Sequence, residues 1–331
     1  MRRGRTALAA GIALLALVAT GCGAGSGPVD LAEVGQAQAP LPGGVLIGKA
    51  ALPPAAAATP NCGDATASLR PPATLPAPGH MPSGSTMAAI QKRGFLIAGV
   101  DQNTYLFGYR NPKTNDLEGF DIQMVRDVAK AILGNPNAVQ FKAISSQQRI
   151  GVLQNHQVDL VARTFTITCA RKQQVDFSTV YYQAQRRVLV RADSTVRDIG
   201  DLGGKRVCAT IGSDSLSQGQ GGAKPPIPVA VNDWSDCLVM LQQGQVDAVS
   251  TDDTILAGMA AQDANTKIVG PSIAPEPYGL AFPKSSADFV SFVNGVLQQV
   301  RTSGQWQQTY EQWVGGRLGQ TPQPPAPVYS N

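Results

Sequence analysis

The sequence has few of the residues that build metal sites and hydrolytic active sites. Its 331 residues include only two histidines and five cysteines. His80 lies in a proline-rich stretch and His156 in a polar turn, so we expect both at the surface. The cysteine spacings do not match a zinc site, because such sites need close Cys or Cys/His pairs. The sequence therefore predicts no metal and no cofactor, and it contains no arrangement of nucleophile and base that would indicate an enzyme.

Charge and long apolar runs are also scarce. Charged residues make up 15% of the chain, and the net charge is only +4. No basic block lies outside the extreme N-terminus, which argues against nucleic-acid binding. Beyond residue 21 there is no run of about 20 apolar residues, so we expect no transmembrane helix in the remainder.

The N-terminus has the pattern of an export signal. Arginines among the first five residues precede an apolar stretch at residues 7–19 that is too short to span a bilayer. Ala19-Thr20-Gly21-Cys22 follows and resembles a lipobox. We therefore expect residues 1–21 to be removed, Cys22 to carry lipid, and the protein to be anchored at the extracytoplasmic face of the cell membrane. An ordinary signal peptide with an incidental cysteine is the alternative.

If the chain is exported, its other four cysteines can form disulfides. An even number favours two disulfides, and three pairings are possible. Cys208 and Cys237 lie within one stretch that reads as a single lobe, so we pair them. This leaves Cys62 to pair with Cys169.

Composition divides the rest of the chain into a spacer, a body and a tail. Residues 22–85 are rich in Pro and Ala and predict a tether, with the region of Cys62 pinned to the body. From there strands and helices alternate, which is typical of an α/β fold. Residues 95–100 predict a buried parallel strand, and the apolar spacing over 122–132 predicts a helix. Residues 316–331 are again proline-rich and predict a flexible tail.

Several short motifs resemble the polar amino-acid branch of the bacterial solute-binding proteins, family 3. They include Gly119-Phe120-Asp121-Ile122, Thr166-Ile167-Thr168, Val175-Asp176-Phe177-Ser178, Asp201-Leu202-Gly203-Gly204-Lys205 and Tyr278-Gly279-Leu280-Ala281-Phe282-Pro283-Lys284. Each motif is weak alone, but their order over about residues 86–315 is specific. The resemblance is strongest to actinobacterial lipoproteins that bind glutamine or glutamate.

The resemblance implies an architecture. The family fold is a two-lobe, type II periplasmic-binding-protein-like α/β fold, joined by a two-strand hinge and closing on its ligand. Lobe 1 would comprise residues 86–185 and 277–315, and lobe 2 residues 186–276. Shifts in composition near residues 187 and 275 agree with these boundaries.

The resemblance also implies how the carboxylate of a free amino acid would be held. Such a group needs a guanidinium and N–H donors. Arg171 stands where the family places its carboxylate-binding arginine, and a surface ion pair with Asp176 is the alternative. Further donors would come from the Thr-Ile-Thr turn and from a lobe 2 loop, at Thr164, Thr166, Gly212, Ser213 and Asp214. A plain helix N-cap is the alternative for that loop.

The ammonium group of the ligand needs a carboxylate. By the resemblance Asp252 would bind it, whereas the adjacent Asp253 could instead cap the next helix. Asp101 ends a strand at the sheet edge where ligands collect, and it either joins the ammonium site or holds a polar cluster together. Tyr105 or Phe107 would stack on the ligand, and either could equally belong to the core.

Arg163 bears on which amino acid is bound. The family's glutamine binders have a small residue at this position. A second guanidinium near the pocket would leave a neutral amide beside an unpaired charge, whereas an acidic side chain would neutralise it. We therefore favour glutamate or aspartate over glutamine or asparagine. An outward-pointing strand end is the alternative for Arg163, and Arg110 or Lys113 could supply similar charge.

Three functions follow from the resemblance. The first is binding of an amino acid for an ABC importer. The second is a sensor whose closed form signals through a membrane protein to a cytoplasmic kinase; ligand-driven closure is the same in both, so the sequence does not separate them. The third is a dehydratase-like enzyme on the same fold, which we disfavour because Asp252 and Asp253 are better explained by an ammonium ligand than as a catalytic pair.

Overall fold

The computed structural model describes residues 39–53, 61–216, 224–318 and 323–330. The predicted signal peptide and the predicted lipidation site, Cys22, lie outside these residues. The residues from Leu41 to Asn331 group into one compact unit. Within the described part of the chain, every helix is too short or too polar to cross a membrane.

One part of the molecule is built on a five-stranded sheet with the order β6-β2-β7-β15-β8. Its strands are β2 (Leu96–Val100), β6 (Val139–Ala143), β7 (Leu160–Ala162), β8 (Asp176–Phe177) and β15 (Ala281–Phe282). The central strand β2 is continuously apolar and pairs in parallel with β6 and β7, as expected for a strand covered on both faces. A separate small sheet consists of β3 (Asn103–Thr104), β4 (Gly108–Arg110) and β5 (Leu117–Glu118), which come between β2 and β6 in the sequence. We call this part lobe 1.

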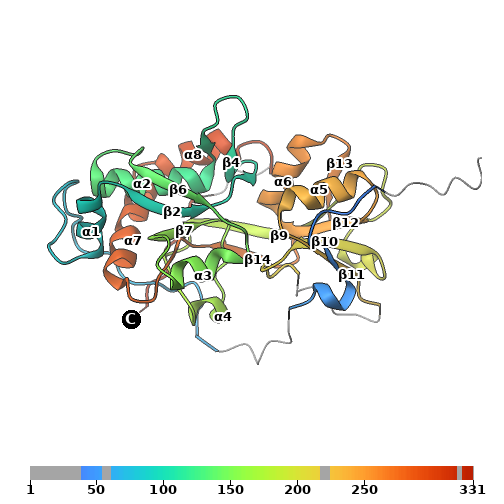
Figure 1. The fold of residues 1–331 in the computed structure, drawn as a ribbon, viewed down its shortest axis with the longest axis horizontal. Helices are drawn as coiled ribbons and strands as arrows, with labels where there is room; N and C mark the ends of the chain where they lie inside the picture. Colours follow the sequence, from blue (N-terminus) through green and yellow to red (C-terminus); the bar gives the residue numbers. More distant parts are fainter. Residues whose placement is uncertain (1–38, 54–60, 217–223, 319–322, 331) are drawn as a thin grey trace, which may run out of the picture. The chain divides into compact units, whose positions relative to one another are not determined.

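Lobe 1 is stabilised by helices around an apolar core that includes a cluster of aromatic rings. Its helices are α1 (Thr86–Arg93), α2 (Phe120–Leu133), α3 (Gln148–Gln154), α4 (Cys169–Lys172), α7 (Ala287–Thr302) and α8 (Gln305–Trp313). The core brings together rings from α2, α8, two strands and the segments next to strands, namely Phe107, Phe120, Tyr181, Tyr182, Tyr278, Trp306 and Tyr310. Helices from the end of the chain thus pack against the first half of the body (Figure 1).

The other part, which we call lobe 2, is built on a seven-stranded sheet with the main order β1-β11-β10-β12-β9-β13. Its strands are β1 (Leu46–Ile47), β9 (Tyr182–Arg191), β10 (Arg206–Thr210), β11 (Ile227–Val231), β12 (Ala248–Asp252), β13 (Thr266–Val269) and β14 (Pro275–Tyr278). The helices of this lobe are α5 (Trp234–Gln242), α6 (Asp253–Gln262) and the short 3₁₀ helices η2 (Gly48–Ala51) and η3 (Ile199–Leu202). The predicted disulfide Cys208–Cys237 is confirmed and ties β10 to α5.

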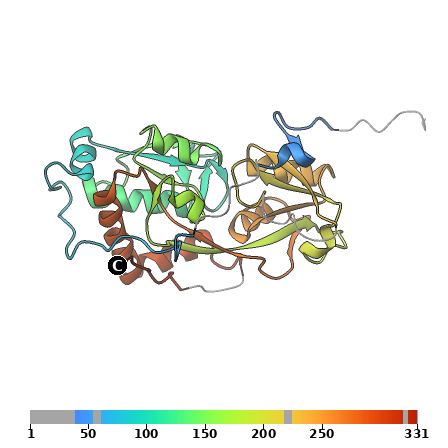
Figure 2. The same cartoon turned by 90° about the horizontal axis from the view of Figure 1, so that it is seen from below.

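Two strands carry the chain between the lobes. The second half of β9 pairs with β12 and β13, whereas its first half pairs with β14. β14 is followed directly by β15 of the lobe 1 sheet. Figures 1 and 2 both show β9 as the long strand that reaches from one lobe to the other. This is the predicted two-strand hinge; the residue boundaries predicted for the lobes remain a prediction.

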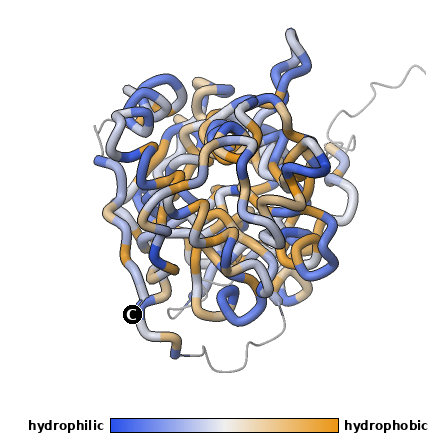
Figure 3. Tube along the Cα trace, turned by 90° about the vertical axis from the view of Figure 1, so that its left-hand side faces the viewer, coloured by the Kyte–Doolittle hydropathy of each residue, from blue (hydrophilic) through white to orange (hydrophobic). Residues whose placement is uncertain are grey.

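Hydrophilic segments of the Cα trace lie mostly on its outside, and hydrophobic segments lie between them (Figure 3). Lobe 1 and lobe 2 keep separate apolar clusters, one centred on the aromatic residues and one on β10, β11 and α5. Each lobe therefore has its own core.

Parts of the predicted tether and tail are folded onto the body, which corrects the sequence-based expectation. Leu46–Ile47 forms β1 on the edge of β11, and the following Ala51 is buried in the lobe 2 core. At the other end of the chain, Tyr329 bridges to Ser68. Exposed strand edges carry unpaired N–H and C=O groups, so an apolar segment of low periodicity can still be ordered by adding to one.

Candidate functional site

The predicted site residues follow strand ends in both lobes. Asp101 comes directly after β2 and Arg163 after β7, which are parallel neighbours in lobe 1. Gly212 lies in the loop after β10, and Asp252 ends β12, the parallel neighbour of β10 in lobe 2. The carboxyl ends of parallel strands share one edge of a sheet. Each lobe therefore brings its candidate residues to one edge.

Arg163 and Asp101 form a buried ion pair within lobe 1. Arg163 has no exposed surface, and its Nη2 lies 2.8 Å from Asp101 Oδ2. The other guanidinium nitrogens donate to the carbonyl of Ile144 and to the hydroxyl of Ser146. Asp101 also accepts hydrogen bonds from Gln102, Asn103 and Thr104. Asp101 thus holds a polar cluster together, which was one of its two predicted roles.

This ion pair corrects the argument for ligand preference that was based on Arg163. The side chain is neither an outward-pointing strand end nor an unpaired charge, because Asp101 neutralises it. Arg110 does not replace it, since its guanidinium is exposed and bonds Gln102 and Asn115. Lys113 is likewise exposed. Any preference for an acidic ligand must therefore come from other groups.

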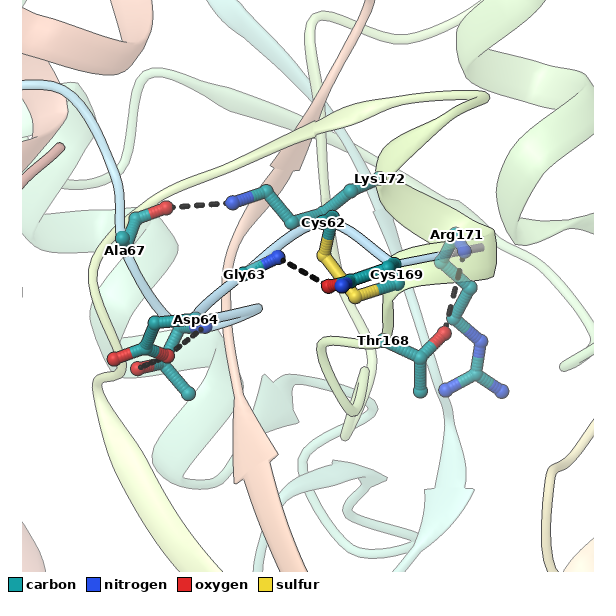
Figure 4. The surroundings of a disulfide bond; sticks show 10 residues. Cys62, Gly63, Asp64, Ala67, Thr168, Cys169, Arg171 and Lys172 are labelled. Carbon is teal, nitrogen blue, oxygen red and sulfur yellow. Dashed lines mark hydrogen bonds between the residues drawn. A yellow bond between two sulfur atoms is a disulfide. The ribbon is translucent and has the colours of Figure 1, made fainter. Parts of the chain in front are cut away.

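Arg171 lies in α4, at the point where the disulfide Cys62–Cys169 fastens this helix (Figure 4). That disulfide confirms the second predicted pairing. The guanidinium of Arg171 is mostly buried and donates to the carbonyl of Thr166 at 2.7 Å. Its Nη2 lies 3.6 Å from Asp214 Oδ1, across the gap between the lobes. The alternative surface ion pair with Asp176 is wrong, because Asp176 pairs with Lys284 instead. Arg171 therefore faces lobe 2 as a buried, positioned cation.

The lobe 2 loop approaches lobe 1 closely at Gly212. This residue has φ +82°, and a Cβ atom there would lie 2.6 Å from Cα of Gln147. Its carbonyl accepts a hydrogen bond from Arg149 at 3.1 Å. Ser213 uses its hydroxyl and its N–H within the loop, both bonding the carbonyl of Thr210. Only a glycine permits this contact, and the donors predicted at Ser213 serve the loop itself.

Asp214 contributes its carboxylate, rather than the predicted backbone donor, to the contact between the lobes. Its oxygens lie 3.6 Å from Arg171 and 3.7 Å from Arg186. Burial raises the pKa of Asp214, but Arg171, Arg186 and Arg149 together outweigh that effect, so the pKa is below its usual value. Asp214 is therefore an anion held between guanidinium groups.

Asp252 and Asp253, which the sequence left as alternatives, have different surroundings. Asp252 is buried and accepts a hydrogen bond at Oδ2 from the hydroxyl of Tyr278, whereas its Oδ1 has no hydrogen-bond partner among the described residues. Burial, followed by the charges of Glu276 and Asp214, raises the pKa of Asp252 well above its usual value. Asp253 instead accepts from the N–H of Gln185 in the hinge. The unmatched oxygen of Asp252 is the one suited to an ammonium group.

Three charged residues of the cluster were missed by the sequence analysis. Arg149 is buried on α3 and donates to carbonyls of both lobes, including that of Gly212. Burial and then the nearby Arg171 and Arg163 lower the pKa of Arg149. Arg186 of β9 and Glu276 of β14 form an ion pair and are each only 1% exposed. The one signal in the sequence that could have revealed the last two was the presence of charged residues, Arg186 and Glu276, in the segments that form the hinge strands.

The remaining predicted residues lie beside this cluster or away from it. Phe107 packs in the aromatic core and cannot stack on a ligand, which corrects that alternative. Tyr105 packs against lobe 2 near Gly258 of α6. Thr164 has φ +39°, and its N–H donates to Asp121, so this donor is already used. Burial raises the pKa of Asp121 to about 6.

The cluster combines the charges that a small zwitterion requires. It presents cations at Arg149, Arg171 and Arg186 and carboxylates at Asp214, Asp252 and Glu276 from both lobes and the hinge. Buried polar atoms are normally hydrogen-bonded, so the unmatched Asp252 Oδ1 and Glu276 Oε2 mark a place for a donor that the described residues do not supply. Among the described residues, no three or more metal-ligating side chains are grouped so that they could hold a metal ion.

Comparison with known proteins agrees with this geometry. The family model for bacterial extracellular solute-binding proteins, family 3, matches residues 96–316. The glutamine-binding protein GlnH of an ABC transporter of Bacillus subtilis is 36% identical over 69% of this chain and 84% of that protein. The glutamate-binding protein GluB of Corynebacterium efficiens is 28% identical over 73% and 86%. An ancestral arginine-binding protein bound to glutamine superimposes with a TM-score of 0.61 at 31% identity, covering 67% of this chain and 99% of that one.

Proposed function

The chain belongs to family 3 of the bacterial extracellular solute-binding proteins, and we propose that it binds a free polar or acidic amino acid between its lobes for delivery to an ABC importer. The observation that carries this proposal is the pairing of a buried guanidinium on lobe 1, Arg171, with a buried and unmatched carboxylate oxygen on lobe 2, at Asp252. These are the groups that the carboxylate and ammonium of an amino acid require.

We propose glutamate or aspartate as the preferred ligand, with glutamine or asparagine next. Three guanidinium groups are buried in the cluster between the lobes, which we take as the ligand cleft, at Arg149, Arg171 and Arg186. They face three carboxylates, at Asp214, Asp252 and Glu276. Because the pKa of Glu276 is raised to about 7, part of this negative charge is absent at neutral pH. The excess positive charge favours a ligand with a net negative charge.

We further propose that the protein is anchored by lipid on Cys22 at the extracytoplasmic face of the membrane. The support is that Cys22 follows small residues directly after the apolar stretch at residues 7–19. Such an anchor would keep the binding protein near a membrane-embedded importer.

Ligand binding is tested by a thermal-shift screen of the twenty amino acids followed by calorimetry, since a ligand that binds only the folded protein raises its melting temperature. Removing one partner of a desolvated charge pair costs about 2 to 5 kcal/mol. Arg171→Ala and Asp252→Ala should therefore weaken binding by roughly 30-fold to several thousandfold. Arg191→Ala, which breaks an exposed ion pair with Asp193 on lobe 2, is the matched control and should bind normally. Either cleft variant within threefold of wild type would show that the site lies elsewhere.

A further inference from the structure

Two carboxylates converge on one guanidinium nitrogen in the hinge. Glu276 Oε1 forms an ion pair with Arg186 Nη2, and Asp214 Oδ2 lies 3.7 Å from the same nitrogen. The three residues come from β14, β9 and the loop after β10, respectively. The side chains of Arg186 and Glu276 are each 1% exposed, and that of Asp214 is 17% exposed. Water therefore screens these two negative charges poorly.

Closely spaced carboxylates do not both ionise readily, and the pair retains a proton to a higher pH than an isolated group. Burial, followed by the nearby Asp214, raises the pKa of Glu276 to about 7, although Arg186 and a hydrogen bond with Thr166 act against this. The pKa of Asp214 is lowered by its arginine neighbours, which outweigh its burial. The proton is therefore held on the Glu276 side of the pair near neutral pH.

The charges around this pair come from every element that packs on it. Arg186 lies on the neighbouring hinge strand, Asp252 at the end of β12, and Tyr278 on β14 itself, bonded to Asp252. On the lobe 1 side, Asp214 is faced by Arg171 and Arg149, and Thr166 contacts Glu276. A ligand carboxylate on Arg171 would enter this same set of charges.

We propose that Glu276 and Asp214 form a carboxyl pair that holds one proton while an acidic ligand is bound, and that this pair sets the preference of the site between an acidic and an amide side chain. The inference rests on the proposed function. Glutamate carries one more negative charge than glutamine, so its binding favours the protonated form of the pair. Below about pH 7 that proton is already present, whereas at higher pH it must be taken from solvent, and the cost in affinity approaches tenfold per pH unit.

The test compares the dissociation constants of glutamate and glutamine by calorimetry from pH 6 to pH 8.5. Their ratio cancels the contributions of the shared carboxylate and ammonium groups, including those made through Asp252. In the wild-type protein, glutamate should lose affinity relative to glutamine as the pH rises above about 7, by up to tenfold per unit. In Glu276→Gln, which carries no charge at any pH, the ratio should be flat and glutamate should still bind at pH 8.5.

Asp127→Asn is the matched control. Asp127 is a buried carboxyl group on α2 whose pKa is also raised to about 6, mainly by burial. It is bonded by Gln123 and Gln305, outside the cleft. This variant should keep the wild-type pH dependence of the ratio. A flat ratio in the wild type, or an unchanged slope in Glu276→Gln, would overturn the proposal.

A second measurement needs no variant. Calorimetry at pH 7.5 in two buffers with different ionisation enthalpies gives the number of protons taken up on binding. Uptake should be larger with glutamate than with glutamine, and equal uptake would overturn the carboxyl pair even if Glu276→Gln does not fold. If the protein binds only one of these ligands, aspartate and asparagine replace them. If it binds no amino acid at all, the proposed function fails instead, which is a distinguishable result.

Discussion

The two arginines that follow β7, Arg163 and Arg171, pair with carboxylates of different lobes. Arg163 pairs at 2.8 Å with Asp101 of its own lobe and bonds Ile144 and Ser146 there, whereas the nearest lobe 2 carboxylate, Asp233, lies 4.0 Å away. Arg171 reaches across to lobe 2, where it joins a cluster in which oxygens of Asp252 and Glu276 have no hydrogen-bond partner among the described residues. Both arginines are buried, so burial alone does not identify a binding residue. What separates them is whether the neutralising carboxylate comes from the same lobe, as Asp101 does for Arg163, or from the other lobe, as Asp214 does for Arg171.

The comparison predicts that Arg163 acts on stability. Replacing Arg163 with Met leaves Asp101 buried without its cation, and breaking a buried ion pair in this way costs about 3 to 5 kcal/mol. Urea unfolding of Arg163→Met should show this loss, and the double variant Arg163→Met/Asp101→Leu should recover part of it. Arg171→Met is the contrasting variant and should mainly lose ligand binding. If Arg163→Met instead bound weakly at unchanged stability, Arg163 would belong to the ligand site.

Local patterns in the sequence were sufficient for central elements of lobe 1. The apolar run at 95–100 predicted β2, observed at Leu96–Val100, and the helical spacing over 122–132 predicted α2, observed at Phe120–Leu133. Both disulfides were also predicted correctly. These features depend on periodicity or on a small set of possible pairings, so they can be predicted without knowledge of tertiary contacts.

The site was only partly predictable, because its charges are paired across long sequence separations. Nothing near Arg163 in the sequence shows that Asp101 neutralises it. Phe107 could have faced a ligand, and it is its packing on distant rings of the hinge, Tyr182 and Tyr278, that places it in the core. The resemblance located individual positions, whereas the electrostatics depend on which of them meet in the folded protein.

A buried charge outside the cleft should affect stability without affecting binding. The pKa of Asp127 is about 6 in the folded protein and about 3.8 for an ordinary aspartate. The folded state therefore binds the proton more tightly, and its contribution to stability is present below pH 3.8 and lost as the pH rises through 6, with a ceiling of about 3 kcal/mol. Asp127→Asn should reduce the loss of unfolding free energy between pH 4 and pH 8.

Two further measurements test whether Asp127 acts on stability alone. Glutamate affinity of Asp127→Asn at pH 7 should stay within twofold of wild type, because Asp127 is bonded by Gln123 and Gln305 rather than by cleft residues. Asp263 is partly exposed and its pKa is lowered by hydrogen bonds from Asn265 and Gln242, so Asp263→Asn should shift the pH dependence of stability in the opposite direction. A change in ligand affinity in Asp127→Asn would mean that its charge is coupled to the cleft.

The smallest effect is expected where no charge is involved, at the closest contact between α6 and lobe 1. A Cβ atom on Gly258 would lie 2.4 Å from the carbonyl oxygen of Tyr105, so alanine there must push the lobes apart. Within a helix, alanine is favoured over glycine by about 1 kcal/mol. The clash should cost about 1 to 2 kcal/mol, and only when α6 and lobe 1 are in contact as they are here. Gly258→Ala should therefore bind ligand roughly 5- to 30-fold more weakly without losing stability. Gly151→Ala on α3, where a Cβ meets nothing within 4 Å, should bind normally. Equal affinities in the two variants would mean that the ligand is held without this contact between the lobes.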